Sequence, residues 1–308
     1  MGLLANLVNF TYRGLCAPVF TIFNKDLSIN TQTIPEYARF LAKNGIDGVL
    51  VHGTTGEGVS MTVAERKAVV DVWAKVVKET KQHLMVQVGG CPLPDAVEMA
   101  KHAELVGADS ILCHAELFFK PHTPSELVDY LKYVGEAAPN TPLLYYHIPG
   151  WTGININMET FINEAVKRIP TFQGIKYTST DLEAGLAALK TNNGKHAVFL
   201  GADTLLASAF GSGFDSAIGT SLNMLPQYAV KILKAAKENN IVEARKLQHV
   251  LTEAVNIISK DGAWVPTMKV AMNLITPINV GVARPPLKNL TEAQIEDMRK
   301  SLKEIGIL

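Results

Sequence analysis

Cysteine is scarce in this sequence, and its few residues are poorly spaced for a structural framework. Cys16, Cys91 and Cys113 are the only three among 308 residues, and none belongs to a CxxC pair. Disulfide-stapled domains and zinc knuckles depend on paired cysteines at short spacings. The sequence therefore argues against both classes and favours a protein of the reducing cytosol.

An excess of charge of one sign is also missing. Lys and Arg number 29, Asp and Glu number 29, and the formal net charge is zero. A protein that holds a phosphate backbone needs a basic field. We therefore expect no nucleic-acid partner.

Long hydrophobic runs are absent as well. No apolar run reaches the roughly 18 residues that a membrane-spanning helix needs. The N-terminus shows no basic segment leading into the apolar core of a signal peptide. We expect a cytoplasmic protein with no membrane partner.

What the sequence does contain is eight short apolar runs separated by amphipathic stretches. The runs are continuously apolar rather than alternating, which is typical of parallel strands covered on both faces. They span residues 14–20, 47–53, 84–90, 109–114, 142–149, 172–178, 197–202 and 215–221. Eight strand-helix units predict an α/β fold, the (β/α)8 TIM barrel, whose usual size of about 250 residues leaves room for an extension.

Helical patterns occupy several of the intervening stretches. Thr62 and Thr123 each begin a TxxE capping box, and Gly45 is expected to end the first helix. After about residue 224 the strands stop and helical patterns dominate. We predict a catalytic barrel domain over residues 1–224 and a C-terminal helical extension over residues 225–308.

The barrel prediction indicates where chemistry should occur, because active sites of this fold lie where the C-terminal strand ends meet their loops. Polar residues gather at these predicted ends. They are Thr54, Thr55, His114, Tyr146, His147, Lys176, Thr178, Asp203, Thr204, Thr220 and Ser221. We expect them to converge on one mouth of the barrel.

Lys176, in the stretch TFQGIKYTST, carries the chemical hypothesis. A lysine at a strand end ordinarily extends its ammonium group into water. In a dry pocket, loss of solvation favours the neutral amine instead. A neutral amine attacks ketones to form Schiff bases, and the resulting iminium accepts electrons from a neighbouring breaking bond. The position therefore indicates aldolase chemistry.

The glycine-rich stretch GTTGEG, residues 53–58, follows a predicted strand. It has neither the GK[ST] ending of a phosphate loop nor GxGxxG spacing. Hydroxyl and backbone N–H groups on such a turn suit a small anion such as a carboxylate. An ordinary strand-to-helix turn is the simpler interpretation of the motif alone. Tyr146 has a similar alternative as a packing residue, although its phenol is placed to relay a proton.

Four stretches together carry a family resemblance: GTTGEG, YYHIP followed by TG, IPTFQGIKYTSTDL and a late ARPPL. The sequence resembles the class I aldolases of the dihydrodipicolinate synthase and N-acetylneuraminate lyase superfamily over essentially its whole length. YHIP together with FFKPHT favours the animal-type branch of that superfamily.

The resemblance implies a role for each matched position. Lys176 would form the Schiff base with the 2-keto group, and Tyr146 would shuttle the proton as the C3–C4 bond breaks. The remaining positions would bind substrate: Thr54 and Thr55 the carboxylate, Thr178 the C4 hydroxyl region, and Gly201, Asp203, Thr204 and Thr220 the polyol tail. The implied reaction is reversible cleavage of N-acetylneuraminate to N-acetylmannosamine and pyruvate, without metal or organic cofactor, in a homotetramer.

Four positions depart from the family pattern. Thr204 stands where a sialic-acid-binding member has glutamate, and Thr220 where serine is expected. Glu116 replaces a usual proline, and Phe118 lies where bacterial relatives offer a tyrosine across the subunit interface. These departures leave the expected Schiff-base residues unchanged. They affect the prediction of which substrate the protein binds.

Three alternatives remain open from the residues. The first is an aldolase for another 2-keto-3-deoxy sugar acid. The second is a metal-dependent enzyme using His52, His114 and His147, although no HxH or HExxH pattern supports it. The third is a catalytically silent sensor of pyruvate-like acids. Turnover distinguishes the third, and sensitivity to EDTA the second.

Overall fold

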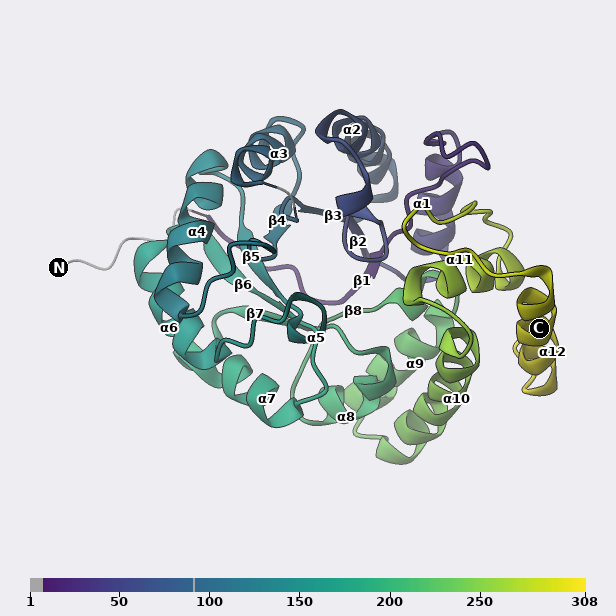
Figure 1. Cartoon of the computed structure of the whole chain (residues 1–308). Coiled ribbons are helices and arrows are strands. Elements are labelled where there is room, and N and C mark those ends of the chain that lie inside the picture. Colours follow the sequence, from purple (N-terminus) through teal and green to yellow (C-terminus); the bar gives the residue numbers. More distant parts are fainter. Residues whose placement is uncertain (1–7, 91) are drawn as a thin grey trace.

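The computed structural model of this protein describes residues 8–90 and 92–308, so Cys91 lies outside the described residues. Eight parallel strands form a closed barrel in the order of the sequence (Figure 1). The strands are β1 Leu15–Pro18, β2 Gly48–Val51, β3 His83–Gln87, β4 Ser110–Cys113, β5 Leu143–His147, β6 Phe172–Tyr177, β7 Ala197–Leu200 and β8 Ala217–Ile218. Each overlaps one predicted apolar run, which confirms the TIM-barrel prediction.

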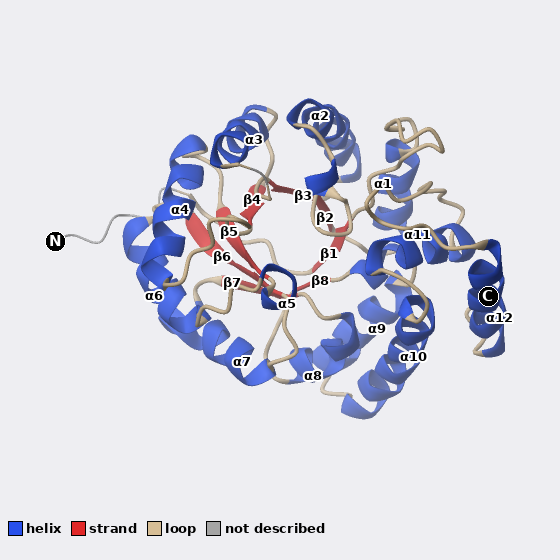
Figure 2. Ribbon diagram, in the orientation of Figure 1, coloured by secondary structure: helices blue, strands red, loops and turns tan. Residues whose placement is uncertain are grey.

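The helices lie around the barrel, apart from the short α5, which lies near the centre of the view (Figure 2). They are α1 Ile34–Lys43, α2 Val63–Thr80, α3 Leu93–Leu105, α4 Pro124–Ala137, α5 Pro149–Thr152, α6 Met158–Arg168, α7 Leu182–Lys190, α8 Leu206–Gly211, α9 Pro226–Lys237, α10 Ile241–Ser259, α11 Trp264–Ile275 and α12 Glu292–Glu304. Short 3-10 turns lie at η1 Gly58–Ser60, η2 Thr191–Gly194, η3 Asp203–Leu205 and η4 Thr220–Asn223.

Local sequence signals fix several helix ends. Thr62 and Thr123 form the predicted capping boxes, each side chain accepting from a backbone N–H three residues later. Gly45 follows the last turn of α1 with a φ of 81° and donates its N–H to Ala42. A left-handed residue at this position favours glycine, because it lacks the Cβ that would clash.

Two hydrophobic cores hold the layers together. A large outer core lies between the strands and the surrounding helices, and a smaller one fills the barrel interior. Phe10 belongs to the interior core and meets Phe199 edge-on at 6.3 Å between ring centroids, while Tyr12 stacks on Phe199 at 5.8 Å. The barrel interior is therefore a packed core, and ligand space is left at the C-terminal strand ends.

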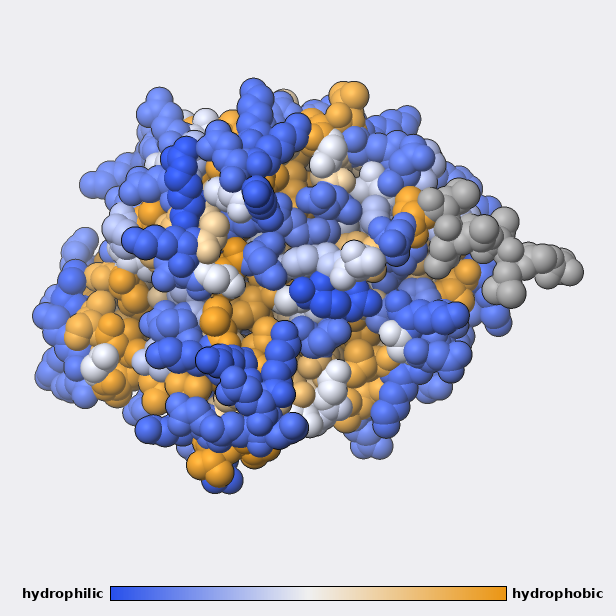
Figure 3. Space-filling view, turned by 180° about the vertical axis from the view of Figure 1, so that it is seen from behind, coloured by the Kyte–Doolittle hydropathy of each residue, from blue (hydrophilic) through white to orange (hydrophobic). Residues whose placement is uncertain are grey.

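The C-terminal helices pack on the barrel and on one another. Helix α9 packs against α8 and α10, and α10 contacts α11 and α12. The division at residue 224 stays a prediction. Figure 3 views the molecule from the side opposite to Figure 1, where polar side chains alternate with apolar ones. Within the described residues, every helix is too short or too polar to cross a bilayer.

Candidate active site

Strand pairing places Lys176 beside Tyr146. The two residues are direct partners in the register of β5 and β6, so their side chains point to the same side of the sheet. Both are buried, with 4% and 2% of their surface exposed. The Lys176 Nζ lies 4.1 Å from the centroid of the Tyr146 ring. A lysine amine and a phenol are therefore adjacent inside the barrel mouth.

The GTTGEG loop follows β2 and brings a threonine to the same phenol. Thr54 Oγ1 lies 3.1 Å from the Tyr146 hydroxyl. The turn needs its glycines, because a Cβ on Gly56 would lie 2.9 Å from the carbonyl oxygen of Val19 and one on Gly58 2.3 Å from that of His52. Glu57, between them, adopts a left-handed φ of 51°. The loop thus presents its hydroxyls from a tightly packed backbone.

Thr55 belongs to a chain of hydrogen bonds that begins in the C-terminal extension. The Trp264 indole donates to Thr220 Oγ1 at 3.1 Å, and Thr220 Oγ1 lies 2.8 Å from Thr55 Oγ1. An indole N–H only donates. With Trp264 as donor, Thr220 can give its own proton to Thr55. That arrangement leaves the Thr55 hydroxyl free to donate to a carboxylate in the cavity.

Asp203 lines the cavity, and its carboxylate also supports the loop after β8. It accepts from the backbone N–H of Thr220 at 3.2 Å, from that of Ser221 at 2.9 Å, and from the Ser221 hydroxyl. Burial raises the pKa of Asp203, while these hydrogen bonds and the charge of Lys176 act in the opposite direction. Besides its predicted contact with the polyol tail, Asp203 therefore positions Thr220, a role that the sequence did not indicate.

Thr178 and Gly201 lie at neighbouring strand ends. Gly201 donates its N–H to Tyr177 at 2.7 Å, and a Cβ on Gly201 would lie 2.0 Å from Thr178 Oγ1. Only glycine allows this approach. Among the described residues, the buried Thr178 hydroxyl has no hydrogen-bond partner. It is therefore available to a polar group of a ligand.

All nine predicted site residues line one cavity of about 290 Å³. They are Thr54, Thr55, Tyr146, Lys176, Thr178, Gly201, Asp203, Thr204 and Thr220. The structure thus brings together the nine positions to which the resemblance gave roles, and those roles stay predictions. A second cavity of about 270 Å³ adjoins the first and shares five residues with it: Thr54, Tyr146, Ile148, Trp151 and Trp264. Of the other predicted strand-end residues, His114 lines the adjoining cavity, whereas His147 and Ser221 line neither cavity.

Sequence reasoning missed several residues that line the catalytic cavity. Trp151, on the short helix α5 near the centre of Figure 1, and Trp264, at the start of α11, both contribute. Asn256 and Ser259 contribute from α10. The only available signal was that tryptophans are rare in this chain, with three in total. Nothing in the periodicity of α10 marks Asn256 as facing the barrel mouth.

The three histidines proposed for the metal alternative have different surroundings. The His114 Nδ1 lies 2.8 Å from the Ala115 carbonyl oxygen, and burial lowers the pKa of His114. His147 stacks on Tyr177 at 5.3 Å, and burial lowers its pKa to about 4. His52 is buried with a left-handed φ of 65°. Across residues 8–90 and 92–308, no three His, Cys, Asp or Glu side chains are grouped to hold a metal ion.

Comparisons with known proteins agree with this geometry. The model of the dihydrodipicolinate synthetase family matches residues 11–305. N-acetylneuraminate lyase from Homo sapiens is 33% identical over 298 residues, covering 96% of this chain and 93% of the relative. Its counterpart from Gallus gallus is 34% identical over 294 residues, with coverages of 95% and 96%.

Solved structures give the same result. N-acetylneuraminate lyase from Aliivibrio salmonicida superposes with a TM-score of 0.92 at 31% identity, covering 97% of this chain and 99% of that one. The lyase from Proteus mirabilis superposes with a TM-score of 0.91 at 29% identity, with coverages of 96% and 99%. The similarity therefore extends over both the barrel and the C-terminal helices.

Proposed function

Since the chain belongs to the dihydrodipicolinate synthetase family, we propose that it is a Schiff-base aldolase that reversibly cleaves N-acetylneuraminate to N-acetylmannosamine and pyruvate. The observation that carries the proposal is the buried Lys176 amine, 4.1 Å from the Tyr146 ring, in a cavity lined by Thr54 and Thr55. This arrangement supplies a nucleophile, a proton carrier and donors for a carboxylate.

Each step of the cleavage uses one of these groups. The Lys176 amine attacks the C2 ketone, and loss of water leaves an iminium. Tyr146 takes up the proton of the C4 hydroxyl while it passes its own phenolic proton to the substrate carboxylate. The C3–C4 bond breaks, and its electron pair moves into the iminium to give an enamine and an aldehyde. Protonation of the enamine at C3 and hydrolysis release pyruvate and restore Lys176.

The preferred sugar acid depends on the far end of the cavity. Thr204 stands there instead of the expected glutamate, and Asn256 lines the cavity from α10. A neutral hydroxyl holds a polyol tail less firmly than a carboxylate does. The alternative substrate is therefore another 2-keto-3-deoxy sugar acid with a shorter or differently substituted tail.

The proposal also includes the oligomeric state and the location: the protein is a homotetramer in the cytoplasm. Phe118 and Phe119 are 82% and 83% exposed, and their rings meet edge-on at 5.0 Å between centroids. Exposed aromatic patches commonly mark interfaces, which supports self-association through this surface. The buried thiols of Cys16 and Cys113 fit a reducing compartment.

Two measurements test the proposal. Pyruvate release from a panel of 2-keto-3-deoxy acids identifies the substrate, and activity is expected to survive EDTA. Borohydride in the presence of pyruvate should attach an adduct to Lys176 and abolish activity. Lys269 provides an internal control because it is also buried, but its ammonium is fully occupied by acceptors. An adduct at Lys269, or no adduct, would contradict the Schiff-base assignment.

A further inference from the structure

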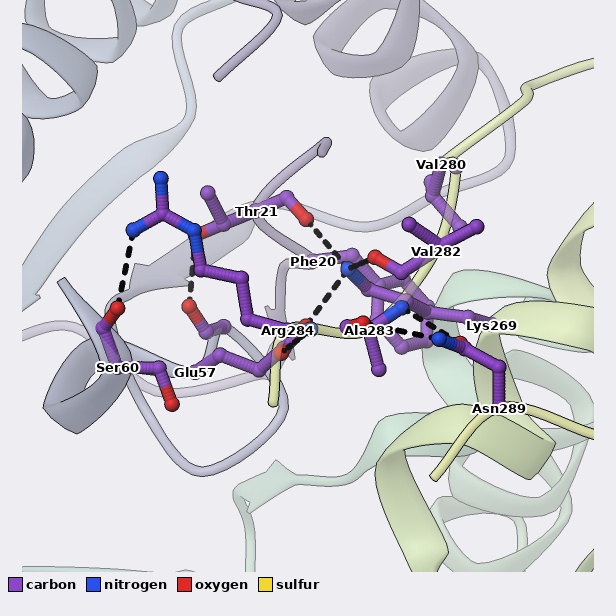
Figure 4. Close-up of polar contacts among 12 residues, drawn as sticks. Phe20, Thr21, Glu57, Ser60, Lys269, Val280, Val282, Ala283, Arg284 and Asn289 are labelled. Carbon is purple, nitrogen blue, oxygen red and sulfur yellow. Dashed lines mark hydrogen bonds and ion pairs between the residues drawn. The ribbon is translucent and has the colours of Figure 1, made fainter. Parts of the chain in front are cut away.

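A second buried lysine lies behind the carboxylate-binding loop. Lys269, on α11, has a side chain only 1% exposed. Its Nζ lies 2.6 Å from Glu57 Oε1 and donates to the carbonyl oxygens of Thr21 at 2.8 Å and Val282 at 2.7 Å (Figure 4). An ammonium has three N–H donors. Two of them are used on the carbonyl oxygens, and the ammonium charge forms an ion pair with the glutamate of GTTGEG.

Glu57 is bound to the C-terminal extension through its second oxygen as well. Its Oε2 accepts the backbone N–H of Arg284 at 2.8 Å. The side chain is 1% exposed, so water does not compete for either bond. Both oxygens of one buried carboxylate are thus held by residues more than two hundred positions later in the sequence.

The backbone of Glu57 in turn fixes the orientation of a peptide unit in the site. The Glu57 N–H donates to the Thr54 carbonyl oxygen at 3.1 Å. That carbonyl and the N–H of Thr55 belong to one trans peptide unit and point in opposite directions. Holding the carbonyl therefore aims the Thr55 N–H away from Glu57. This N–H is one of the main-chain donors proposed for the substrate carboxylate.

Thr21 adds a second connection between the lysine and the loop. Its carbonyl accepts from Lys269, and its hydroxyl donates to the Gly56 carbonyl oxygen at 2.6 Å. Gly56 and Glu57 are consequently restrained from two directions. Removing the lysine would abolish the ion pair with Glu57 and the bond to the Thr21 carbonyl together, so both restraints on the loop would weaken.

We infer that Glu57 and Lys269 are positioning residues that set the affinity for the carboxylate shared by all 2-keto acids, acting through the Thr54–Thr55 peptide. The inference rests on the proposed function, since it assigns the carboxylate to this loop. It gives the C-terminal extension a direct part in substrate binding. Because the carboxylate is bound before and during the reaction, the effect falls on binding and not on the chemical step.

A matched control is available among the contacts that attach the C-terminal extension to the barrel outside the GTTGEG loop. The Arg284 guanidinium binds Glu65 through two bonds, at 3.0 and 2.6 Å, and also reaches the Ser60 and Leu27 carbonyl oxygens. None of these bonds involves residues 53–57. Glu65→Gln therefore weakens the attachment of the extension without touching the proposed path.

The experiment compares Lys269→Met, Glu57→Gln and Glu65→Gln with the wild type. The dissociation constant of pyruvate is obtained from the concentration dependence of borohydride trapping, and kcat and KM are measured for a short and a long 2-keto acid. Lys269→Met should weaken pyruvate binding by about tenfold, equivalent to roughly 1.4 kcal/mol. KM should rise by a similar factor for both acids, with a much smaller change in kcat. Glu57→Gln, which keeps the shape, should show the same pattern with a smaller factor.

The other possible results contradict either the inference or the proposed function, and they can be told apart. Unchanged pyruvate binding in a folded Lys269→Met protein overturns the inference. The inference is also overturned if Glu65→Gln raises KM as much as Lys269→Met does while the two variants lose the same amount of melting temperature. If Lys269→Met does not fold, Glu57→Gln decides by the same constants. If the wild type neither traps pyruvate nor cleaves any 2-keto acid, the proposed function fails, and the inference fails with it.

Discussion

At the scale of single residues, the proposed site combines hydroxyl groups with Lys176, the proposed Schiff-base lysine. The Tyr146 phenol is 3.1 Å from Thr54 Oγ1, and its ring lies next to Lys176. The ring and the hydroxyl therefore have separable roles. The ring packs in the barrel interior, and the hydroxyl is the proposed proton carrier.

Tyr146→Phe separates these roles. The variant should keep the fold and still form the trapped adduct slowly, because the ring and Lys176 remain. Its kcat should fall by about 10²-fold or more, the scale typical of losing a positioned proton carrier. Steady-state kinetics and borohydride trapping on the same preparation provide the measurement. A near-normal kcat would mean that Tyr146 serves packing alone.

Thr204→Glu tests the tail end of the cavity. A carboxylate accepts charge-assisted hydrogen bonds worth about 1.5 to 3 kcal/mol, against about 1 for a neutral hydroxyl. We expect KM for N-acetylneuraminate to fall by roughly tenfold for each 1.4 kcal/mol gained, with kcat and short 2-keto acids little affected. Thr204→Gln, of equal length and neutral, is the control. No improvement in a folded Thr204→Glu protein would mean that the true substrate lacks the matching hydroxyl.

At the scale of elements, the C-terminal extension is attached to the start of α2 through charge. Glu65 is the N3 residue of that helix and accepts from both Thr62 and Arg284. The hydrogen bond from Arg284 is the largest cause that lowers the pKa of Glu65 to about 2. In an unfolded chain a glutamate titrates near 4.3.

This difference predicts a dependence of stability on pH. Because the folded state binds the proton less readily, the contribution of Glu65 is fully present above about pH 4.3 and is lost as the pH falls toward about 2. Urea unfolding from pH 6 to pH 3 should therefore show the wild type exceeding Glu65→Gln in stability at pH 6, with the gap shrinking on acidification. A gap independent of pH would show that the charge on Glu65 does not contribute. The contribution should be modest, since the pair is partly solvated.

At the scale of the whole molecule, one surface carries aromatic side chains that the monomer leaves in water. Phe118 and Phe119 belong to the segment between β4 and α4, and they line a surface hollow together with Leu93, Leu117 and Tyr130. Burying such side chains against a second copy is favourable in proportion to their apolar area. This is the basis for expecting an oligomer.

Replacing both phenylalanines by serine should therefore reduce the mass of the protein in solution. Sedimentation velocity on wild type and double variant at equal concentration measures the change. Leu308→Ser, which removes another exposed apolar side chain far along the chain, should leave the mass unchanged. A double variant with the wild-type mass would exclude this surface as a subunit contact.

The sequence by itself determined the barrel and the identity of the chemical groups. Eight continuously apolar runs specify buried parallel strands, because only strands covered on both faces tolerate apolar residues at every position. Thr62 and Thr123 fix their helix starts through bonds that span three residues. The rule that barrel chemistry lies at strand ends gave Lys176, Tyr146 and the two threonines of GTTGEG as candidates, and the family resemblance supplied their expected roles. These features depend on local pattern, and a sequence displays local pattern directly.

Only the tertiary structure decided which distant residues meet. The 4.1 Å approach of Lys176 to Tyr146 depends on the register of β5 and β6, and the bond from Trp264 to Thr220 depends on how α11 packs on the closed barrel. Lys269 reads in the sequence as an ordinary helical lysine, yet it is buried against Glu57. The physical reason is that side-chain contacts between remote segments are selected by packing and desolvation, which exist only once the chain has closed.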